Sequence, residues 1–206
     1  MNKILMAMLV LTALACNVAK KEEGLKIYGR TEITDEGDTI YHKIADYKFV
    51  DQDSNFVTPE TFKDKIYIAD FFFTSCPTIC PKMKTQLLRV YDKYQNNPEV
   101  GILSHSIDPT HDTVAVLHEF AERLGVSSDK WHFITGDKED IFKIGQTSYM
   151  VSANEDPNEP GGYIHSGAFI LVDKERRVRG LYDGTLPEAV DKLMNDIDIL
   201  LKEYEK

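Results

Sequence analysis

Long apolar runs alternate with amphipathic stretches along most of this chain. Residues 66–73 form an apolar run broken only by Asp70, and residues 100–107 form a second, largely apolar run. Runs of this kind are typical of strands that are covered on both faces of a sheet. Between them, apolar residues recur with the spacing of one helix face, which predicts a helix from about 81 to 95. The order strand, helix, strand indicates two parallel strands joined by a crossover helix.

The same alternation continues to the C-terminus and indicates an α/β fold. Further predicted elements are a helix that ends at Leu124, a strand at 131–135, a short helix at 139–144, strands at 168–173 and 178–182, and an amphipathic helix at 187–204. Upstream, residues 44–57 predict a hairpin, and residues 58–62 a short helix with Thr58 as its N-cap. The polar stretch 154–162 is predicted to be an exposed loop. This is the thioredoxin order of elements, so we expect a three-layer fold with a central mixed sheet flanked by helices and an N-terminal hairpin.

Composition narrows the class of protein further. The chain has 206 residues, of which 42% are hydrophobic and 28% are charged, as in one ordinary globular domain. Its formal net charge of −10 argues against a nucleic-acid partner, because such a partner requires a basic surface. We therefore expect no nucleic-acid binding.

The N-terminus resembles the signal of a bacterial lipoprotein. Lys3 precedes an apolar run over 4–15 that is too short to span a membrane, and Cys16 follows it directly. We expect a signal peptide at 1–15, a lipid-attached tether and N-terminal extension at 16–43, and the folded domain at 44–206. The domain would then lie outside the cytoplasm, on the periplasmic side, anchored to the membrane through a lipid on Cys16. The alternative is an ordinary cleaved signal followed by an incidental cysteine.

Two cysteines mark the candidate chemistry. Cys76 and Cys80 stand where the strand at 66–73 gives way to the helix at 81–95. Ligands bind beyond the carboxyl ends of strands in such sheets, and a helix N-terminus favours thiolates. The pair is thus a redox couple, with a disulfide as its oxidised form, or a binding site for a soft metal. A purely structural disulfide is the third interpretation, but it would stabilise the domain only modestly across so short a loop.

Three features of the domain occur together: Thr-Ser-Cys-Pro-Thr-Ile-Cys-Pro at 74–81, Ser-Ile-Asp-Pro-Thr-His-Asp-Thr at 106–113, and His165 ahead of the last hairpin. In these features the domain resembles the Sco/SenC family of copper-binding proteins involved in assembling cytochrome c oxidase. The resemblance covers roughly Asp46 to the last helix. It implies that Cys76, Cys80 and His165 bind one copper ion. Two sulfurs and one imidazole suit both Cu(I) and Cu(II), and three ligands leave the site open for transfer of the metal.

The other residues of these motifs have competing interpretations. A lone histidine such as His165 is often an ordinary surface or core residue. Ligation is favoured by its place just before the strand at 168–173, where the thioredoxin fold usually has a cis-proline that faces the cysteines. Asp108 and Asp112 follow the strand next to the cysteine strand, and each either caps a helix or supports the metal ligands or a partner. The family often has an aspartate immediately before its histidine. Because Ile164 stands there in this chain, we transfer no role to that position.

The sequence therefore predicts a copper metallochaperone that helps to assemble the dinuclear copper centre of a terminal oxidase, with the copper-receiving subunit as its partner. We expect no catalytic activity to be required for this role. The alternative is a thiol–disulfide oxidoreductase that acts on the cysteines of a copper-receiving protein through Cys76 and Cys80, without need of His165. A peroxide-reducing enzyme is a third interpretation, which would need rapid reaction of one cysteine with peroxide.

Overall fold

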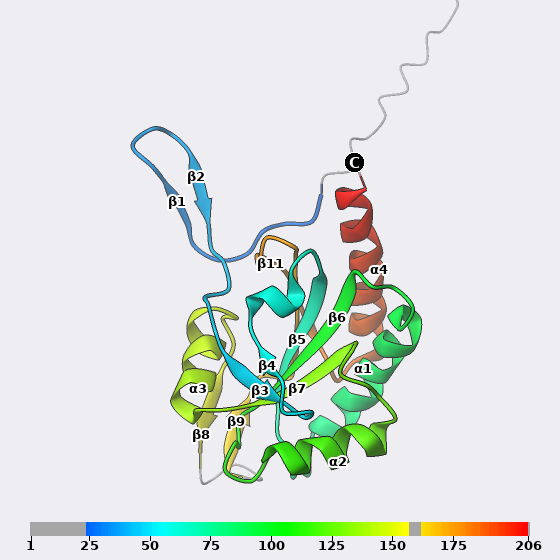
Figure 1. Ribbon diagram of the computed structural model, residues 1–206. Helices are drawn as coiled ribbons and strands as arrows, with labels where there is room; N and C mark the ends of the chain where they lie inside the picture. The colour runs from blue at the N-terminus through cyan, green and yellow to red at the C-terminus, as the bar shows by residue number, and fades with distance from the viewer. Residues whose placement is uncertain (1–23, 157–161, 206) are drawn as a thin grey trace, which may run out of the picture.

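The computed structural model describes residues 24–156 and 162–205, and of Ile164 and His165 it describes the backbone. A sheet of seven strands, ordered β11-β10-β5-β6-β7-β3-β4, forms the centre of the fold (Figure 1). Its strands are β3 (Phe49–Asp51), β4 (Phe56–Val57), β5 (Ile66–Phe72), β6 (Val100–Ser106), β7 (Trp131–Thr135), β10 (Ala168–Val172) and β11 (Val178–Asp183). Strands β5, β6 and β7 are parallel, and the other pairs are antiparallel. The predicted mixed sheet is confirmed.

Helices cover both faces of this sheet. They are α1 (Cys80–Tyr94), α2 (Val114–Leu124), α3 (Lys138–Thr147) and α4 (Pro187–Tyr204), with a 3-10 helix at Pro59–Phe62. Helices α1 and α4 contact each other on one side of the sheet, and α3 lies on the other side (Figure 1). The structure thus has the predicted three layers of a thioredoxin-like fold.

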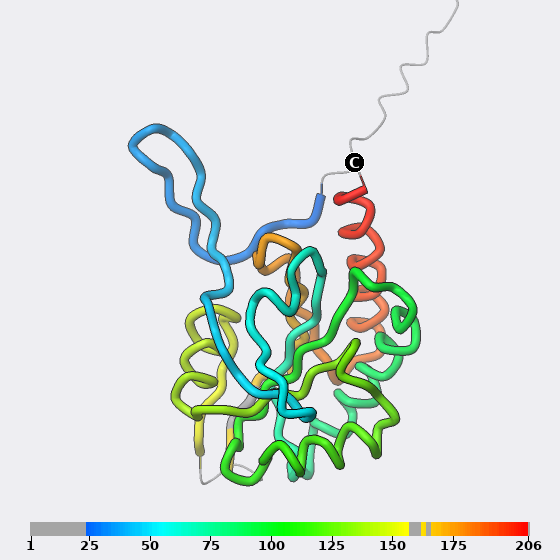
Figure 2. The backbone as a smooth tube through the Cα atoms, viewed as in Figure 1, coloured from blue at the N-terminus to red at the C-terminus, as the bar shows by residue number. Residues whose placement is uncertain are grey.

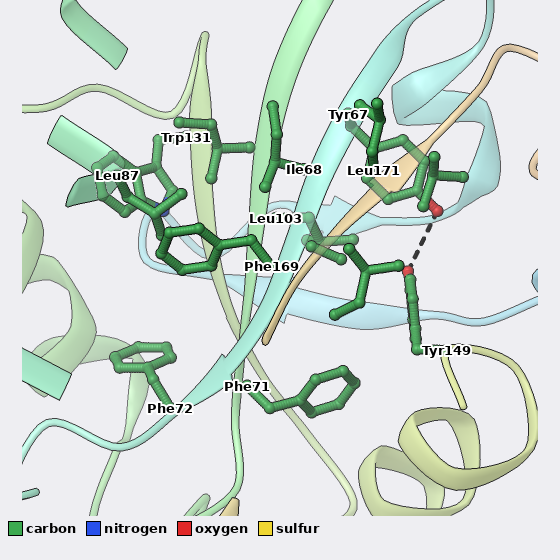
Figure 3. Packing of buried hydrophobic residues seen from close by; sticks show 14 of the residues in the cluster. Tyr67, Ile68, Phe71, Phe72, Leu87, Leu103, Trp131, Tyr149, Phe169 and Leu171 are labelled. Atoms are coloured by element: carbon green, nitrogen blue, oxygen red, sulfur yellow. Dashed lines mark hydrogen bonds between the residues drawn. The ribbon is translucent and has the colours of Figure 1, made fainter. Parts of the chain in front are cut away.

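Strand β5 divides the core into two halves because its side chains alternate between the two faces of the sheet. Phe72 points to the side of Leu87 and Trp131, whereas Phe71 points to the side of Tyr149 (Figure 3). All of these side chains are buried. Burying each aromatic side chain contributes about 2 to 3 kcal/mol to folding, so this strand is a rigid support for the loop that follows it.

The short polar strands were not predicted. The stretch expected to be a loop at 154–162 contains part of β8 (Ala153–Glu155), which pairs antiparallel with β9 (Tyr163–His165). The loop prediction is therefore wrong for Asn154 and Glu155, while residues 157–161 lie outside the described part. The predicted short helix at 139–144 is longer, because the Asp137 side chain caps α3 by accepting from the backbone N–H of Asp140 at 3.1 Å.

A further hairpin, β1 (Thr31–Ile33) with β2 (Thr39–Tyr41), projects from the body of the domain (Figures 1 and 2). Just before it, the chain runs past the end of α4 (Figure 2), where the backbone N–H of Leu25 donates to Glu203 at 2.7 Å. Cys16 and the expected signal peptide lie outside the described residues. Within the described part, no helix combines the length and apolarity needed to cross a membrane.

Candidate functional site

The two motif cysteines lie at the junction of β5 and α1. The loop leaves β5 after Phe72 and turns where the backbone N–H of Cys76 donates to the carbonyl of Phe73 at 3.3 Å. Cys80 is the first residue of α1, and Pro81, in its first turn, suits a position where the backbone needs no N–H donor. Both cysteines are in the thiol form and buried, with 6% and 4% of their surfaces exposed. The predicted pair is therefore assembled at the carboxyl end of a central strand.

Burial has a strong effect on the Cys80 thiol. It raises the pKa of Cys80 far above its usual value, and the hydrogen bond with Cys76 raises it further, while the Lys84 ammonium opposes the shift. The effect of burial on the pKa of Cys80 is therefore larger than that of the helix N-terminus, which we expected from the sequence to favour a thiolate. Because a metal binds the thiolate, binding at Cys80 must displace a proton.

An apolar groove of about 280 Å³ opens beside the cysteines, between α1 and α2. Its apolar walls are formed by Phe73, Pro81, Leu88, Phe120 and Leu124. Any group that reaches the sulfurs from this side crosses an apolar surface.

A buried ion pair lies beneath this groove. Lys84, one turn after Cys80, donates to Asp70 at 2.7 Å and to the Ser104 hydroxyl at 3.1 Å. Ser104 also donates to Asp70 and accepts from the Trp131 indole N–H at 2.8 Å. In the sequence, Asp70 is visible only as an interruption in an apolar run. One signal for the ion pair was available in the sequence. A single carboxylate in a strand that is covered on both faces is buried, and a buried carboxylate needs a cationic partner.

Asp112 fastens the start of the cysteine loop to the neighbouring strand. Its carboxylate is fully buried and accepts from the backbone N–H of Thr74 at 3.0 Å and from the Thr74 hydroxyl. It also accepts from the Ser106 hydroxyl at 2.6 Å, and it lies 3.0 Å from Nδ1 of His111. This carboxylate holds the pKa of His111 above its ordinary value. Asp112 therefore fixes the backbone two residues before Cys76.

The interpretation of Asp112 as a helix cap is wrong. The N-cap of α2 is Thr113, whose hydroxyl accepts from the backbone N–H of Val116 at 3.4 Å. Asp108 does not cap a helix either. Its Oδ1 accepts from the Tyr163 hydroxyl at 2.9 Å and from the backbone N–H of His111 at 3.4 Å. Both aspartates thus connect segments of the candidate site.

His165 is the last residue of β9, and its backbone pairs with Ala153 of β8. Its side chain lies outside the described part of the structure, so ligation by its imidazole stays a prediction. The strand itself reaches the cysteine loop, since the Tyr163 ring lies 5.2 Å from the Phe73 ring between centroids. Among the described side chains, no three His, Cys, Asp or Glu residues form a metal-binding group.

The two histidines around the second motif differ in their surroundings. His111 is exposed and contacts the Thr74 hydroxyl at 3.4 Å. His105 is fully buried and stacks on Phe71 at 4.5 Å between ring centroids. Burial lowers the pKa of His105 to about 4. His105 is therefore a neutral core residue at physiological pH.

Comparison with known proteins gives a consistent set of matches. Residues 36–202 match a family model described as SCO1/SenC. A SCO1/SenC family lipoprotein from Bacillus anthracis superposes with a TM-score of 0.71 at 26% identity, over 78% of this chain and 95% of its own. BsSco, a member of the Sco family of cytochrome c oxidase assembly proteins, gives 0.67 at 30% identity, over 77% and 93%. Arabidopsis thaliana ScoI with copper bound gives 0.62 at 26% identity, over 75% and 97%.

Proposed function

Because this chain belongs to the SCO1/SenC family, we propose that it is a copper metallochaperone that binds one copper ion through Cys76, Cys80 and His165. The observation that carries this proposal is the pair of buried thiols at the start of α1, beside a strand that ends at His165. The contact between Tyr163 and Phe73 supports the approach of that strand to the cysteine loop.

The proposed donor set suits copper in either oxidation state. Thiolates are soft ligands that prefer Cu(I), and an imidazole accommodates both Cu(I) and Cu(II). Three protein ligands leave a coordination position that the ligands of a recipient occupy during transfer. A site closed by four protein ligands would instead favour retention of the metal, as in structural zinc sites.

We propose that the recipient is the copper-receiving subunit of a terminal oxidase and that the copper enters its dinuclear copper centre. Two relatives support this: ScoI of Arabidopsis thaliana was solved with copper bound, and BsSco belongs to a family of cytochrome c oxidase assembly proteins. The apolar groove beside the cysteines supports contact with a protein during transfer.

Titration of the reduced full-length protein with Cu(I) and Cu(II) tests the ligand set. The wild type should bind one copper ion, and Cys76→Ala, Cys80→Ala and His165→Ala should each weaken binding by more than about tenfold, because each removes one of three ligands. His118→Ala is the matched control, since His118 is half-exposed and its ring contacts Asp53 and Glu122. Unchanged affinity in His165→Ala would remove the imidazole from the proposed site.

A second candidate function is thiol–disulfide exchange. It is favoured by the hydrogen bond between Cys76 and Cys80, which indicates that the two sulfurs are close enough to pair. In this reaction the two thiols are oxidised to a Cys76–Cys80 disulfide, while a disulfide of the copper-receiving protein is reduced to two thiols. Turnover on such an oxidised partner that survives in His165→Ala, while copper binding is lost, would favour this function over the chaperone.

We further propose that a lipid on Cys16 anchors the protein to the membrane on the periplasmic side. The support is the apolar run that precedes Cys16, together with the description of the Bacillus anthracis relative as a lipoprotein. Metabolic labelling with a radioactive fatty acid tests this, with Cys16→Ser as the comparison. Label in the wild type but not in Cys16→Ser is the expected result, and equal label in both would contradict it.

A further inference from the structure

Tyr163 lies where three segments of the candidate site meet. Its hydroxyl donates to Asp108 Oδ1 at 2.9 Å and accepts from Lys138 Nζ at 3.3 Å. Its ring packs on Phe73, three residues before Cys76. Asp108 belongs to the second motif, and Tyr163 stands two residues before His165. One side chain thus connects the cysteine loop, the second motif and the strand of the proposed histidine ligand.

The strand β9 has little support from the main sheet. It pairs with β8 in a separate two-stranded sheet, at the end of the molecule where the chain passes from β6 to α2 (Figure 1). A two-stranded hairpin on its own is marginally stable in water. Strand β8 is held by contacts with α3, such as those of Gln146 with the Ala153 carbonyl at 3.0 Å and with Asn154 at 2.7 Å. Strand β9 is held through its pairing with β8 and through the backbone bond of Ser166 to Ser152 at 3.0 Å.

The Tyr163 side chain connects β9 to Asp108 and Lys138. Its bond to Asp108 has an ionised acceptor, and hydrogen bonds of this kind are about twice as strong as neutral ones. The Lys138 ammonium lies 5.2 Å from the centre of the Tyr163 ring and also forms an ion pair with Glu155 of β8. Asp108 and Lys138 therefore hold the Tyr163 hydroxyl from two directions.

We propose that Tyr163 is a positioning residue, whose hydrogen bond to Asp108 sets the place of β9 against the cysteine loop and thereby the copper affinity of the site. This inference rests on the proposed ligand set of Cys76, Cys80 and His165. In this proposal Asp108 accepts the hydrogen bond from the Tyr163 hydroxyl. Asp108 then needs neither a direct contact with the metal nor a role in helix capping.

Full-length variants distinguish the effect of the Tyr163 hydroxyl from that of its ring. Tyr163→Phe keeps the packing on Phe73 and removes the donor, and Asp108→Ala removes the acceptor. Each should raise the dissociation constant for Cu(II) about tenfold, as expected for loss of a hydrogen bond to a charged group. The double variant should lose no more than either single variant, because both remove the same bond. Asp108→Asn keeps an acceptor oxygen without its charge, so its copper affinity should lie between those of the wild type and Asp108→Ala.

The matched control is Tyr94→Phe. The Tyr94 hydroxyl also donates to an aspartate, Asp198, at 2.7 Å, but it lies at the other end of α1, about 20 Å along the helix from Cys80. Tyr94→Phe should leave copper affinity unchanged. The nitrogen hyperfine coupling of bound Cu(II) adds a readout that a general loss of stability does not change, and it should weaken in Tyr163→Phe.

Hydrogen exchange of the β9 amides without copper separates this inference from the proposed function. Exchange should be faster in Tyr163→Phe than in the wild type or Tyr94→Phe. Equal exchange rates, an unchanged dissociation constant in Tyr163→Phe, or additive losses in the double variant would each overturn the positioning role. If His165→Ala binds copper as tightly as the wild type, the ligand set itself is wrong.

Discussion

Replacing Lys84 by methionine should strongly destabilise the domain, because it removes the cationic partner of Asp70. The lysine and aspartate side chains are 4% and 0% exposed, and their charged atoms lie 2.7 Å apart. The lysine ammonium also lies 3.9 Å from the centre of the Phe72 ring. Methionine retains most of the apolar packing but, among the described residues, leaves the carboxylate with only its hydrogen bond from Ser104.

The expected cost follows from the burial of both charges. Breaking a buried ion pair by removing one partner costs about 3 to 5 kcal/mol, since the remaining charge stays buried and uncompensated. For a domain of this size, that loss corresponds to a fall in melting temperature of about 6 to 20 °C. The double variant Asp70→Leu/Lys84→Met removes both charges and should recover most of the lost stability.

Urea unfolding followed by circular dichroism measures these differences, and a thermal scan provides an independent check. Lys93→Met is the matched control, because Lys93 also pairs with an aspartate, Asp198, but both side chains are about 40% exposed. It should cost no more than about 1 kcal/mol. A stability loss in Lys84→Met no larger than in this control would refute the proposed cost of leaving Asp70 unpaired. A double variant no more stable than the single variant would refute it as well.

Two further predictions follow from buried groups near the site. Burial lowers the pKa of His105 from 6.5 to about 4, so the unfolded chain binds an additional proton between these pH values. The contribution of His105 to the unfolding free energy is complete above pH 6.5, and about 3 kcal/mol of it is lost as the pH falls to 4. Unfolding curves of the wild type and His105→Leu at several pH values check this. Equal pH dependence of the unfolding free energy in the two proteins would contradict it. Asp112→Ala should lower the unfolding free energy by at least about 2 kcal/mol and weaken copper binding, because it leaves the hydroxyl of Ser106 and the N–H of Thr74 without their acceptor. Thr113→Ala, which removes the α2 cap, should cost about 1 kcal/mol and leave copper affinity unchanged; equal copper affinities in the two variants would refute this role of Asp112.

The sheet and helices could be predicted because burial leaves a periodic record in the sequence. The run over 66–73 corresponds to β5, and the predicted closing helix corresponds residue for residue to α4 (Pro187–Tyr204). Strands β8 and β9 show no such periodic pattern of apolar residues. Their residues are largely polar, and their pairing depends on backbone bonds and on contacts with α3 and Asp108, none of which has a sequence period.

The candidate site was predictable only in part. Cys76 and Cys80 could be placed because their strand and helix could be placed. The local rule that assigned capping to Asp112 was wrong, since Thr113 is one residue nearer to the helix and the carboxylate turns instead to Thr74. The partners of Asp108 and Asp70 are distant in sequence, 55 and 14 residues away, so only the folded chain reveals Tyr163 and Lys84.

The most direct test of the copper site is X-ray absorption spectroscopy of the Cu(I)-loaded protein. The copper in the wild type should be surrounded by two sulfurs and one imidazole nitrogen, with the nitrogen lost in His165→Ala and retained in His118→Ala. A shell of two sulfurs that is identical in the wild type and His165→Ala would contradict ligation by His165.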